Sequence, residues 1–192
     1  KDNNDKLADI LAIFNKAAVE VCEGQQYDMD FETLENVSID DYLKMIELKT
    51  AVLLAASLKI GALIANAKQD DVNHIYEFGR NLGIAFQLMD DILDLYGDPE
   101  MFGKQVGGDV IANKKTYLLL KAKELAKGET RKELEFCLTS TAIKPENKVE
   151  RIKTIFNALG VKKSAIDEMN LFYNTAISHL DSIDAPDRAA DN

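Results

Sequence analysis

Tryptophan is absent from this 192-residue chain, and proline, cysteine and histidine are scarce, with three, two and two residues respectively. Cys22 and Cys137 lie far apart and form no Cys-x-x-Cys or Cys/His spacing, which argues against a disulfide or a zinc pair and favours two small buried hydrophobic residues. His74 and His179 are isolated in the sequence and are expected to be structural or exposed. A reducing compartment, the cytoplasm, fits this composition.

The chain also lacks any run of five or more like charges and any basic stripe, although its formal net charge is −10. A nucleic-acid groove and an anionic membrane are therefore not expected as partners, and an acidic protein that binds anions needs cations. The most apolar stretch, residues 51–67, is interrupted by Lys59 and leaves no span of about 20 residues for a bilayer. Residues 1–5 hold no apolar signal core.

Long stretches of Ala, Leu, Ile, Lys and Glu, with no alternating strand pattern, predict an all-α fold. Apolar residues spaced by three and four predict a first helix over residues 7–22 that stops at Gly24, followed by a polar connector over 24–37. Ser38, three residues before Asp41, is typical of a helix N-cap. The later predicted helices cover residues 38–67, 69–96, 116–127, 130–140, 145–159 and 163–183, with a glycine-rich loop over 97–113.

The predicted helix over residues 69–96 carries the pattern Gln87-x-x-Asp90-Asp91-x-x-Asp94. At about 100° per residue, these four side chains project from one side of the helix. Like charges at this spacing repel each other, and hard oxygen ligands suit Mg²⁺, which takes one or two carboxylates and is completed by substrate phosphates. A solvated acidic face is the alternative, but the amide one turn before, the apolar residues beneath and the loop that follows favour a magnesium-diphosphate site.

A diphosphate also needs cationic partners, for which Lys49, Lys104 and Lys114 are the candidates. Lys104 follows a glycine, so backbone N–H groups there have room to approach phosphate oxygens. A P-loop is excluded because the spacer after Gly97 is one residue too long and Gln105 stands where Ser or Thr should be. Lys49 lies in an apolar helix, and the alternative for it is a lysine that extends its charge to the surface.

Six short motifs follow one another along the chain: Gly24-Gln25-x-x-Asp28, Lys49-Thr50, Phe86-Gln87-x-x-Asp90-Asp91-x-x-Asp94, Gly103-Lys104, Gly107-Gly108-Asp109 and Lys114-x-Thr116. In order and spacing this series resembles the trans-isoprenyl (polyprenyl) diphosphate synthases, the family that includes farnesyl and geranylgeranyl diphosphate synthases. The resemblance implies an all-α isoprenoid synthase (terpenoid synthase) bundle around a deep cavity. Two aspartate-rich motifs would face each other across its mouth, and this chain holds the second.

The resemblance also implies a transferase reaction. An allylic diphosphate ionises, the double bond of isopentenyl diphosphate attacks the carbocation, and a proton is lost. The resemblance implies Mg²⁺ as cofactor, held by the metal residues Asp90 and Asp94 with Asp91 in support. It also implies a homodimer. The catalytic cations would be Lys49, Lys104 and Lys114. The substrate-binding residues would be Lys49, Thr50, Phe86, Gln87, Lys104 and Lys114.

The first aspartate-rich motif of that family should precede Gln25, yet residues 1–24 contain no such cluster and no Gly-Lys-x-x-Arg element. We therefore expect residues 1–192 to be the C-terminal part of one synthase domain, an incomplete bundle that is inactive alone. A non-catalytic subunit of a heteromeric prenyl synthase is the alternative, and a helical scaffold with an incidental acidic patch is a third. A terpene cyclase would need an Asn/Ser-bearing metal motif, which is not found.

Overall fold

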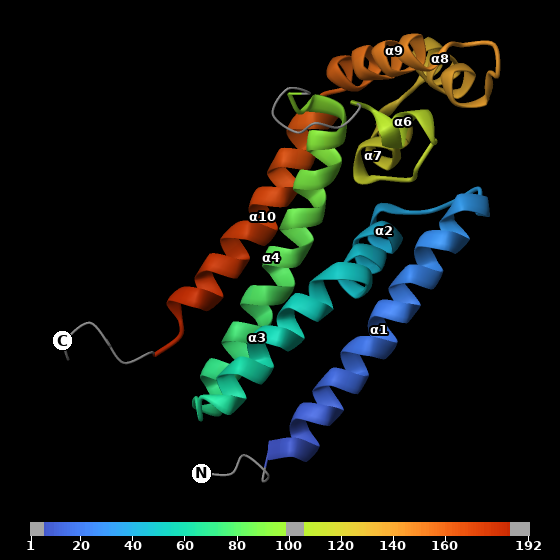
Figure 1. The fold of residues 1–192 in the computed structure, drawn as a ribbon. Coiled ribbons are helices and arrows are strands. Elements are labelled where there is room, and N and C mark those ends of the chain that lie inside the picture. The colour runs from blue at the N-terminus through green and yellow to red at the C-terminus, as the bar shows by residue number, and fades with distance from the viewer. Residues whose placement is uncertain (1–5, 99–105, 185–192) are drawn as a thin grey trace.

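A computed structural model describes residues 6–98 and 106–184, and this part of the chain is helical, without strands (Figure 1). The all-α prediction is thereby confirmed. The elements are α1 (Leu7–Thr33), α2 (Ile39–Ile46), the π-helical segment η2 (Glu47–Ala51), α3 (Val52–Ile64), α4 (Gln69–Tyr96), α6 (Gly108–Ile111), α7 (Tyr117–Leu125), α8 (Gly128–Thr139), α9 (Pro145–Ala158) and α10 (Val161–Asp181).

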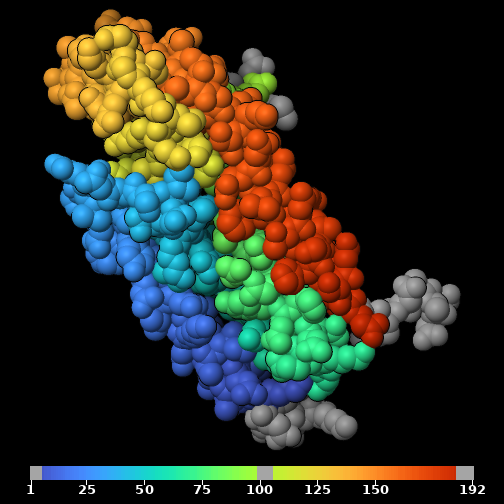
Figure 2. Space-filling view, turned by 180° about the vertical axis from the view of Figure 1, so that it is seen from behind, coloured from blue at the N-terminus to red at the C-terminus, as the bar shows by residue number. Residues whose placement is uncertain are grey.

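The long helices run side by side along one axis. α1 lies along the continuous rod formed by α2, η2 and α3, the rod packs against α4, and α4 packs along α10 (Figure 1). The shorter helices α6 to α9 gather at the end of the molecule where α4 finishes and α10 begins. Figure 2 shows from the opposite side that α10 lies over α4. Among the described residues, no helix combines the length and apolar character needed to cross a lipid bilayer.

The prediction that the first helix stops at Gly24 and gives way to a polar connector is wrong, because α1 continues to Thr33. Gly24 is buried where α1 crosses η2, and a Cβ there would lie 2.3 Å from the Lys49 backbone nitrogen and 2.7 Å from the Leu48 carbonyl carbon. The glycine therefore serves close contact between two backbones and does not end the helix. Only a short connector separates α1 from α2.

The predicted helix start at Ser38 is confirmed. The Ser38 hydroxyl accepts a hydrogen bond from the Asp41 backbone N–H at 3.0 Å, and the Asp41 carboxylate accepts one from the Ser38 backbone N–H at 3.0 Å, which completes a capping box. The rod that follows is interrupted by the five π-helical residues of η2 and ends at Ile64, slightly before the predicted boundary. Such π turns are frequent at functional sites, and this one carries Lys49 and Thr50.

The remaining helices lie close to their predicted ranges, and α4 coincides with the prediction. The predicted loop over 97–113 is partly wrong, because α6 forms within it. Gly107 precedes α6 with a left-handed φ of 80°, and a Cβ there would lie 2.7 Å from the Val149 side chain, so two constraints require glycine. The core below α6 is apolar, and its largest fully buried side chains include Tyr42, Leu88, Leu95, Leu134, Ile152 and Phe156.

Candidate functional site

The predicted site residues of α1 and η2 meet directly. The Lys49 ammonium lies 2.6 Å from the Asp28 carboxylate, and both side chains are half-buried. Asp28 lies one helical turn after Gly24, so the contact between the two backbones at Gly24 brings the carboxylate within reach of the lysine. Lys49 is therefore held by a charged partner, which disfavours the alternative of a lysine that merely extends to the surface.

Asp91 differs from its neighbours on α4 because its carboxylate is buried, with 8% of the residue exposed. One oxygen, Oδ2, accepts hydrogen bonds from the Tyr42 hydroxyl at 2.6 Å and from the Tyr117 backbone N–H at 3.2 Å. Burial raises the pKa of Asp91 to about 7, although the hydrogen bond from Tyr42 acts against this rise. Asp91 thus ties α4 to α2 and to the start of α7, which agrees with a supporting role.

The expectation that four side chains share one open face is therefore correct only in part. Asp90 is exposed, and Gln87 and Asp94 are half-buried, whereas Asp91 points into the core. Consecutive residues on a helix differ in direction by about 100°, so Asp90 and Asp91 face different surroundings.

Stability should depend on pH through Asp91. Between pH 4 and 7 the folded protein keeps a proton on this carboxyl that the unfolded chain releases, so the free energy of unfolding should fall as pH rises through 7. Asp91→Asn cannot titrate, and its amide oxygen can accept both hydrogen bonds. The free energy of unfolding of the wild type, minus that of this variant, should therefore fall by about 2–3 kcal/mol between pH 5 and pH 8.

Urea denaturation of both proteins in EDTA measures this difference. Burial also raises the pKa of Asp109, so both proteins should share a further dependence of the same sign. Because the Asp109 charge also raises the pKa of Asp91, the comparison isolates the part of the pH dependence that requires the Asp91 carboxyl. Parallel stability curves for the wild type and Asp91→Asn would contradict the prediction.

Asp94 organises the start of α6. Its carboxylate Oδ2 accepts a hydrogen bond from the Asp109 backbone N–H at 3.1 Å, and its backbone carbonyl accepts one from the Gly107 N–H at 2.7 Å. A Cβ on Gly108 would lie 3.4 Å from Asp94 Oδ1, an ordinary van der Waals distance, so Gly108 is a direct neighbour of the carboxylate. The glycine-glycine-aspartate motif is thereby placed against the end of the α4 motif.

The surroundings of Asp109 carry an excess of negative charge. Burial raises the pKa of Asp109, Lys114 lowers it, and the charges of Asp94, Asp90 and Asp28 raise it again. The Lys114 ammonium lies 3.9 Å from an Asp109 carboxylate oxygen. Carboxylates from α1, α4 and α6 therefore act on one place, which favours the binding of a cation there.

The donor set fits magnesium. Within residues 6–98 and 106–184, no three His, Cys, Asp or Glu side chains lie close enough to hold a metal ion by themselves. Mg²⁺ does not need such a cage, because it binds one or two carboxylates and completes its shell with water and phosphate oxygens. Asp90 and Asp94, one turn apart on α4, match that requirement. Asp90 makes no hydrogen bond or ion pair within the described part of the chain, so its carboxylate is available.

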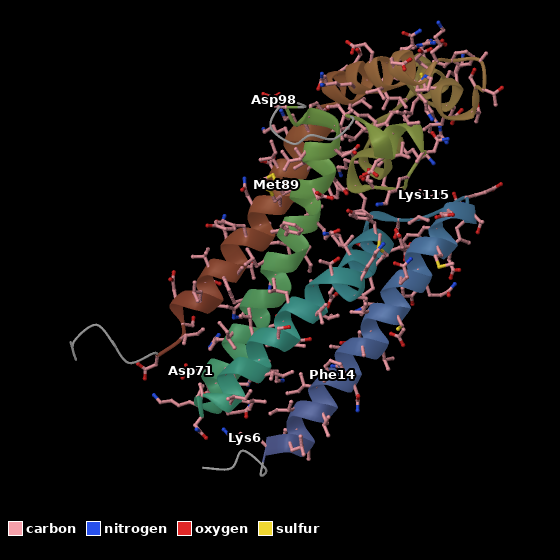
Figure 3. All side chains as sticks on the ribbon, viewed as in Figure 1. Lys6, Phe14, Asp71, Met89, Asp98 and Lys115 are labelled. Atoms are coloured by element: carbon pink, nitrogen blue, oxygen red, sulfur yellow. The ribbon has the colours of Figure 1, made fainter. Side chains whose placement is uncertain are left out.

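An apolar groove adjoins these charges. It has a volume of about 670 Å³ and is lined by Thr50, Leu54, Leu82, Gly83, Ala85, Phe86, Met89, Met169, Asn170 and Tyr173. Thr50 and Phe86, the two predicted pocket residues, both line it, and Phe86 is 62% exposed. Met89 lies on the same part of α4 (Figure 3).

The remaining predicted residues are less informative. Lys104 lies outside the described residues. Lys114 is exposed near Asp109, while its neighbour Lys115 donates hydrogen bonds to backbone carbonyls of Phe31 and Glu32 and so caps the end of α1 (Figure 3). Sequence reasoning assigned no role to Tyr42, and nothing local indicates that its hydroxyl reaches Asp91.

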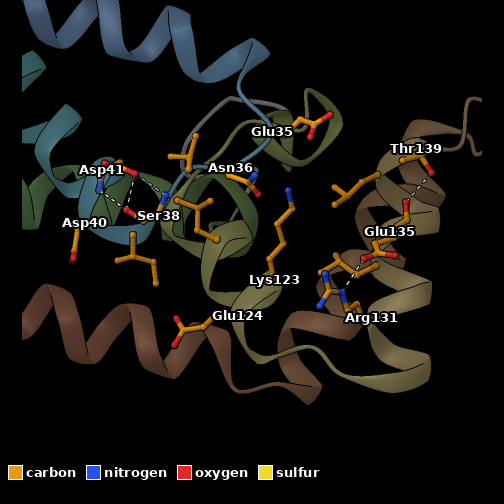
Figure 4. Close-up of a pocket in the computed structure, with 15 residues that line it drawn as sticks. Glu35, Asn36, Ser38, Asp40, Asp41, Lys123, Glu124, Arg131, Glu135 and Thr139 are labelled. Carbon is orange, nitrogen blue, oxygen red and sulfur yellow. Dashed lines mark hydrogen bonds and ion pairs between the residues drawn. The ribbon is translucent and has the colours of Figure 1, made fainter.

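A second hollow of about 810 Å³ lies between the start of α2, α7 and α8, and none of the predicted site residues lines it (Figure 4). Many of its charges are already paired, as Asp41 is with Ser38 and Arg131 with Glu135. It offers no grouping of reactive side chains comparable to the site at the end of α4.

The chain is similar to known proteins in sequence and in fold. The polyprenyl synthetase family model matches residues 2–159. A short chain isoprenyl diphosphate synthase of Methanocaldococcus jannaschii is 38% identical over 153 residues, which cover 80% of this chain and 46% of that protein. A geranylgeranyl diphosphate synthase of Sulfolobus acidocaldarius is 40% identical over 175 residues, covering 89% of this chain and 51% of that protein.

Among solved structures, a geranylgeranyl pyrophosphate synthase superposes with a TM-score of 0.89 at 41% identity, covering 96% of this chain and 57% of that one. This chain therefore spans about half the length of the curated relatives it matches.

Proposed function

Because this chain belongs to the polyprenyl synthetase family, we propose that it carries the second aspartate-rich half of the active site of a trans-prenyl diphosphate synthase. This enzyme would be a Mg²⁺-dependent prenyltransferase that joins an allylic prenyl diphosphate to isopentenyl diphosphate and releases diphosphate. The observation that carries the proposal is the meeting of the Asp28–Lys49 ion pair, the α4 carboxylates and the Asp109–Lys114 pair at one site. An apolar groove adjoins that site.

The cations of this chain would hold the diphosphate. Lys49 and Lys114 each face a carboxylate in the described structure. The oxygens of a bound diphosphate would accept hydrogen bonds from both ammonium groups. Asp28 would keep the Lys49 ammonium in place beforehand, so that little reorganisation is needed on binding. We place Lys104 in the same set by its motif.

The reaction breaks the allylic C–O bond, and the electron pair leaves on a diphosphate oxygen. Mg²⁺, held by Asp90 and Asp94 with Asp91 in support, would neutralise charge that develops on that oxygen. The double bond of isopentenyl diphosphate then forms a new C–C bond with the carbocation, and a proton leaves. Thr50 and Phe86, with the apolar groove around them, would shield the cation and the prenyl chain from water. Gln87, the residue after Phe86, would bind the diphosphate.

We further propose a homodimer in the cytoplasm. Several apolar side chains on α1 are exposed, which supports association through this helix: Leu7, Leu11, Phe14, Val19, Tyr27 and Met29. Phe14 is among the most exposed, at 58% (Figure 3).

Calorimetry with inorganic diphosphate tests the binding proposal. We expect the chain to bind about one diphosphate in the presence of Mg²⁺, and to lose this binding when EDTA removes the metal, because the site is otherwise dominated by carboxylates. Equal binding with and without Mg²⁺, or none in either case, would favour a helical scaffold with an incidental acidic patch.

A turnover assay tests the second part of the proposal. We expect no sustained elongation when this chain alone is incubated with farnesyl diphosphate, labelled isopentenyl diphosphate and Mg²⁺, since it carries one of two aspartate-rich motifs. Sustained elongation would overturn the inactivity of the isolated chain while leaving the binding result intact.

A further inference from the structure

The chain's two histidines meet across the interface between α4 and α10. His74 and His179 are separated by 105 residues, yet their Nδ1 atoms lie 3.1 Å apart, with ring centroids 5.3 Å apart and ring planes at 45°. Both side chains are half-buried. The two histidines are isolated from each other in the sequence, but the fold brings them into direct contact.

We propose that this pair is a binding site for a divalent transition-metal ion of the Zn²⁺ class, distinct from the magnesium site. Unprotonated imidazole nitrogens are common ligands of Zn²⁺, Ni²⁺ and Cu²⁺, whereas Mg²⁺ prefers oxygen. Zn–N bonds are about 2.0–2.1 Å long, so nitrogens 3.1 Å apart correspond to an N–Zn–N angle of about 100°, close to tetrahedral.

Binding requires a small movement of the rings. In the metal-free geometry the two nitrogens face each other nearly head-on, as in one N–H···N hydrogen bond in which either ring donates. Convergence of both lone pairs on one ion would bring the ring centroids to about 4.8 Å, a tilt that half-buried rings can make. Water would fill the other coordination positions, because no third His, Cys, Asp or Glu in the described structure joins the pair.

The neighbouring carboxylates already have other partners. Asp71 accepts a hydrogen bond from the Asp184 backbone N–H at 3.0 Å, and the Asp184 carboxylate lies 2.5 Å from the Lys68 ammonium. These contacts join the beginning of α4 to the end of α10, and an ion between His74 and His179 would add a further link there. The bound ion should therefore stabilise the packing of α10 on α4.

An NMR titration tests the proposal directly, because the chain contains no other histidine. Cys137 is buried as expected, whereas the expectation that Cys22 is also buried is wrong, because it is exposed on α1. The protein should therefore carry no histidine tag and should have Cys22 replaced by serine, since a free thiol also binds Zn²⁺. Excess MgCl₂ would occupy the carboxylates. We expect the ring signals of both histidines to shift together with ZnCl₂ and to saturate near one equivalent.

Two matched variants provide the second arm. His74→Gln and His179→Gln should each weaken Zn²⁺ binding about tenfold or more in calorimetry, because the second imidazole otherwise binds within the same complex. Zn²⁺ should also raise the melting temperature of the parent protein but not of either variant. If the ring signals do not respond to Zn²⁺, or if both variants bind it as tightly as the parent, the contact is a hydrogen bond only and the proposal fails.

Diphosphate binding distinguishes this inference from the proposed function. His74 and His179 do not line the apolar groove and take no part in the charge clusters at the end of α4. The glutamine variants should therefore keep Mg²⁺-dependent diphosphate binding.

Discussion

Replacing Gly24 by alanine is expected to lower the free energy of unfolding by about 2–3 kcal/mol, the cost of overpacking a tight contact. The added Cβ would lie 2.3 Å from the Lys49 backbone nitrogen and 2.7 Å from the Lys49 Cα. Backbone atoms cannot turn aside as a flexible side chain can, so α1 would have to separate from η2. Urea denaturation measures the loss, and it should be accompanied by weaker diphosphate binding because Asp28 moves away from Lys49.

Gly61→Ala is the matched control for this experiment. Gly61 also lies within a helix, but a Cβ there would meet nothing within 4 Å. Alanine has the higher helix propensity, so this variant should gain up to about 1 kcal/mol. If both variants shift stability in the same direction, the close contact between α1 and η2 is not a determinant of the fold.

Replacing Asp90 by asparagine is expected to weaken Mg²⁺-dependent diphosphate binding about 100-fold or more, since even residues that only orient a metal ligand are worth about 10–100-fold. The exposed Asp90 carboxylate makes no hydrogen bond or ion pair within the described residues, so the substitution should leave stability nearly unchanged. Calorimetry with diphosphate at saturating Mg²⁺ measures the effect, and urea denaturation confirms that the fold is intact.

Asp70→Asn serves as its control. Asp70 is exposed in the first turn of the same helix, at the opposite end from the motif, so it removes the same charge from α4 at a distance. Binding should change by less than about twofold, because exposed charges this far apart are screened by salt. An Asp90→Asn protein that binds diphosphate like the wild type would place the magnesium elsewhere.

Local patterns in the sequence were sufficient for much of the architecture. The three- and four-residue spacing of apolar side chains gave α4 correctly, and the Ser38 and Asp41 pair gave the start of α2, because both depend on contacts within one turn. The predicted isoprenoid synthase fold is confirmed by the likeness to solved structures. It followed from the order of the motifs and not from periodicity.

Contacts between segments that are distant in the sequence could not be predicted from such local patterns. Gly24 was interpreted as a helix end because glycine often ends helices, but its role depends on η2, which lies in another part of the chain. The hydrogen bond from Tyr42 to Asp91 and the meeting of His74 with His179 likewise join residues that only the fold brings together. The assignment of Asp90, Asp91 and Asp94 to magnesium stays a prediction.

The π turn of η2 constrains how this protein can evolve. A π turn accommodates one residue more than an α turn, so the helix faces before and after it are out of register with a regular helix. If this segment wound as a regular α-helix with all its residues kept, everything that follows would be rotated by about 100°. The Lys49 ammonium and the α3 surface that packs on α4 would then no longer face their partners. The extra residue and the π turn that accommodates it must therefore be gained or lost together.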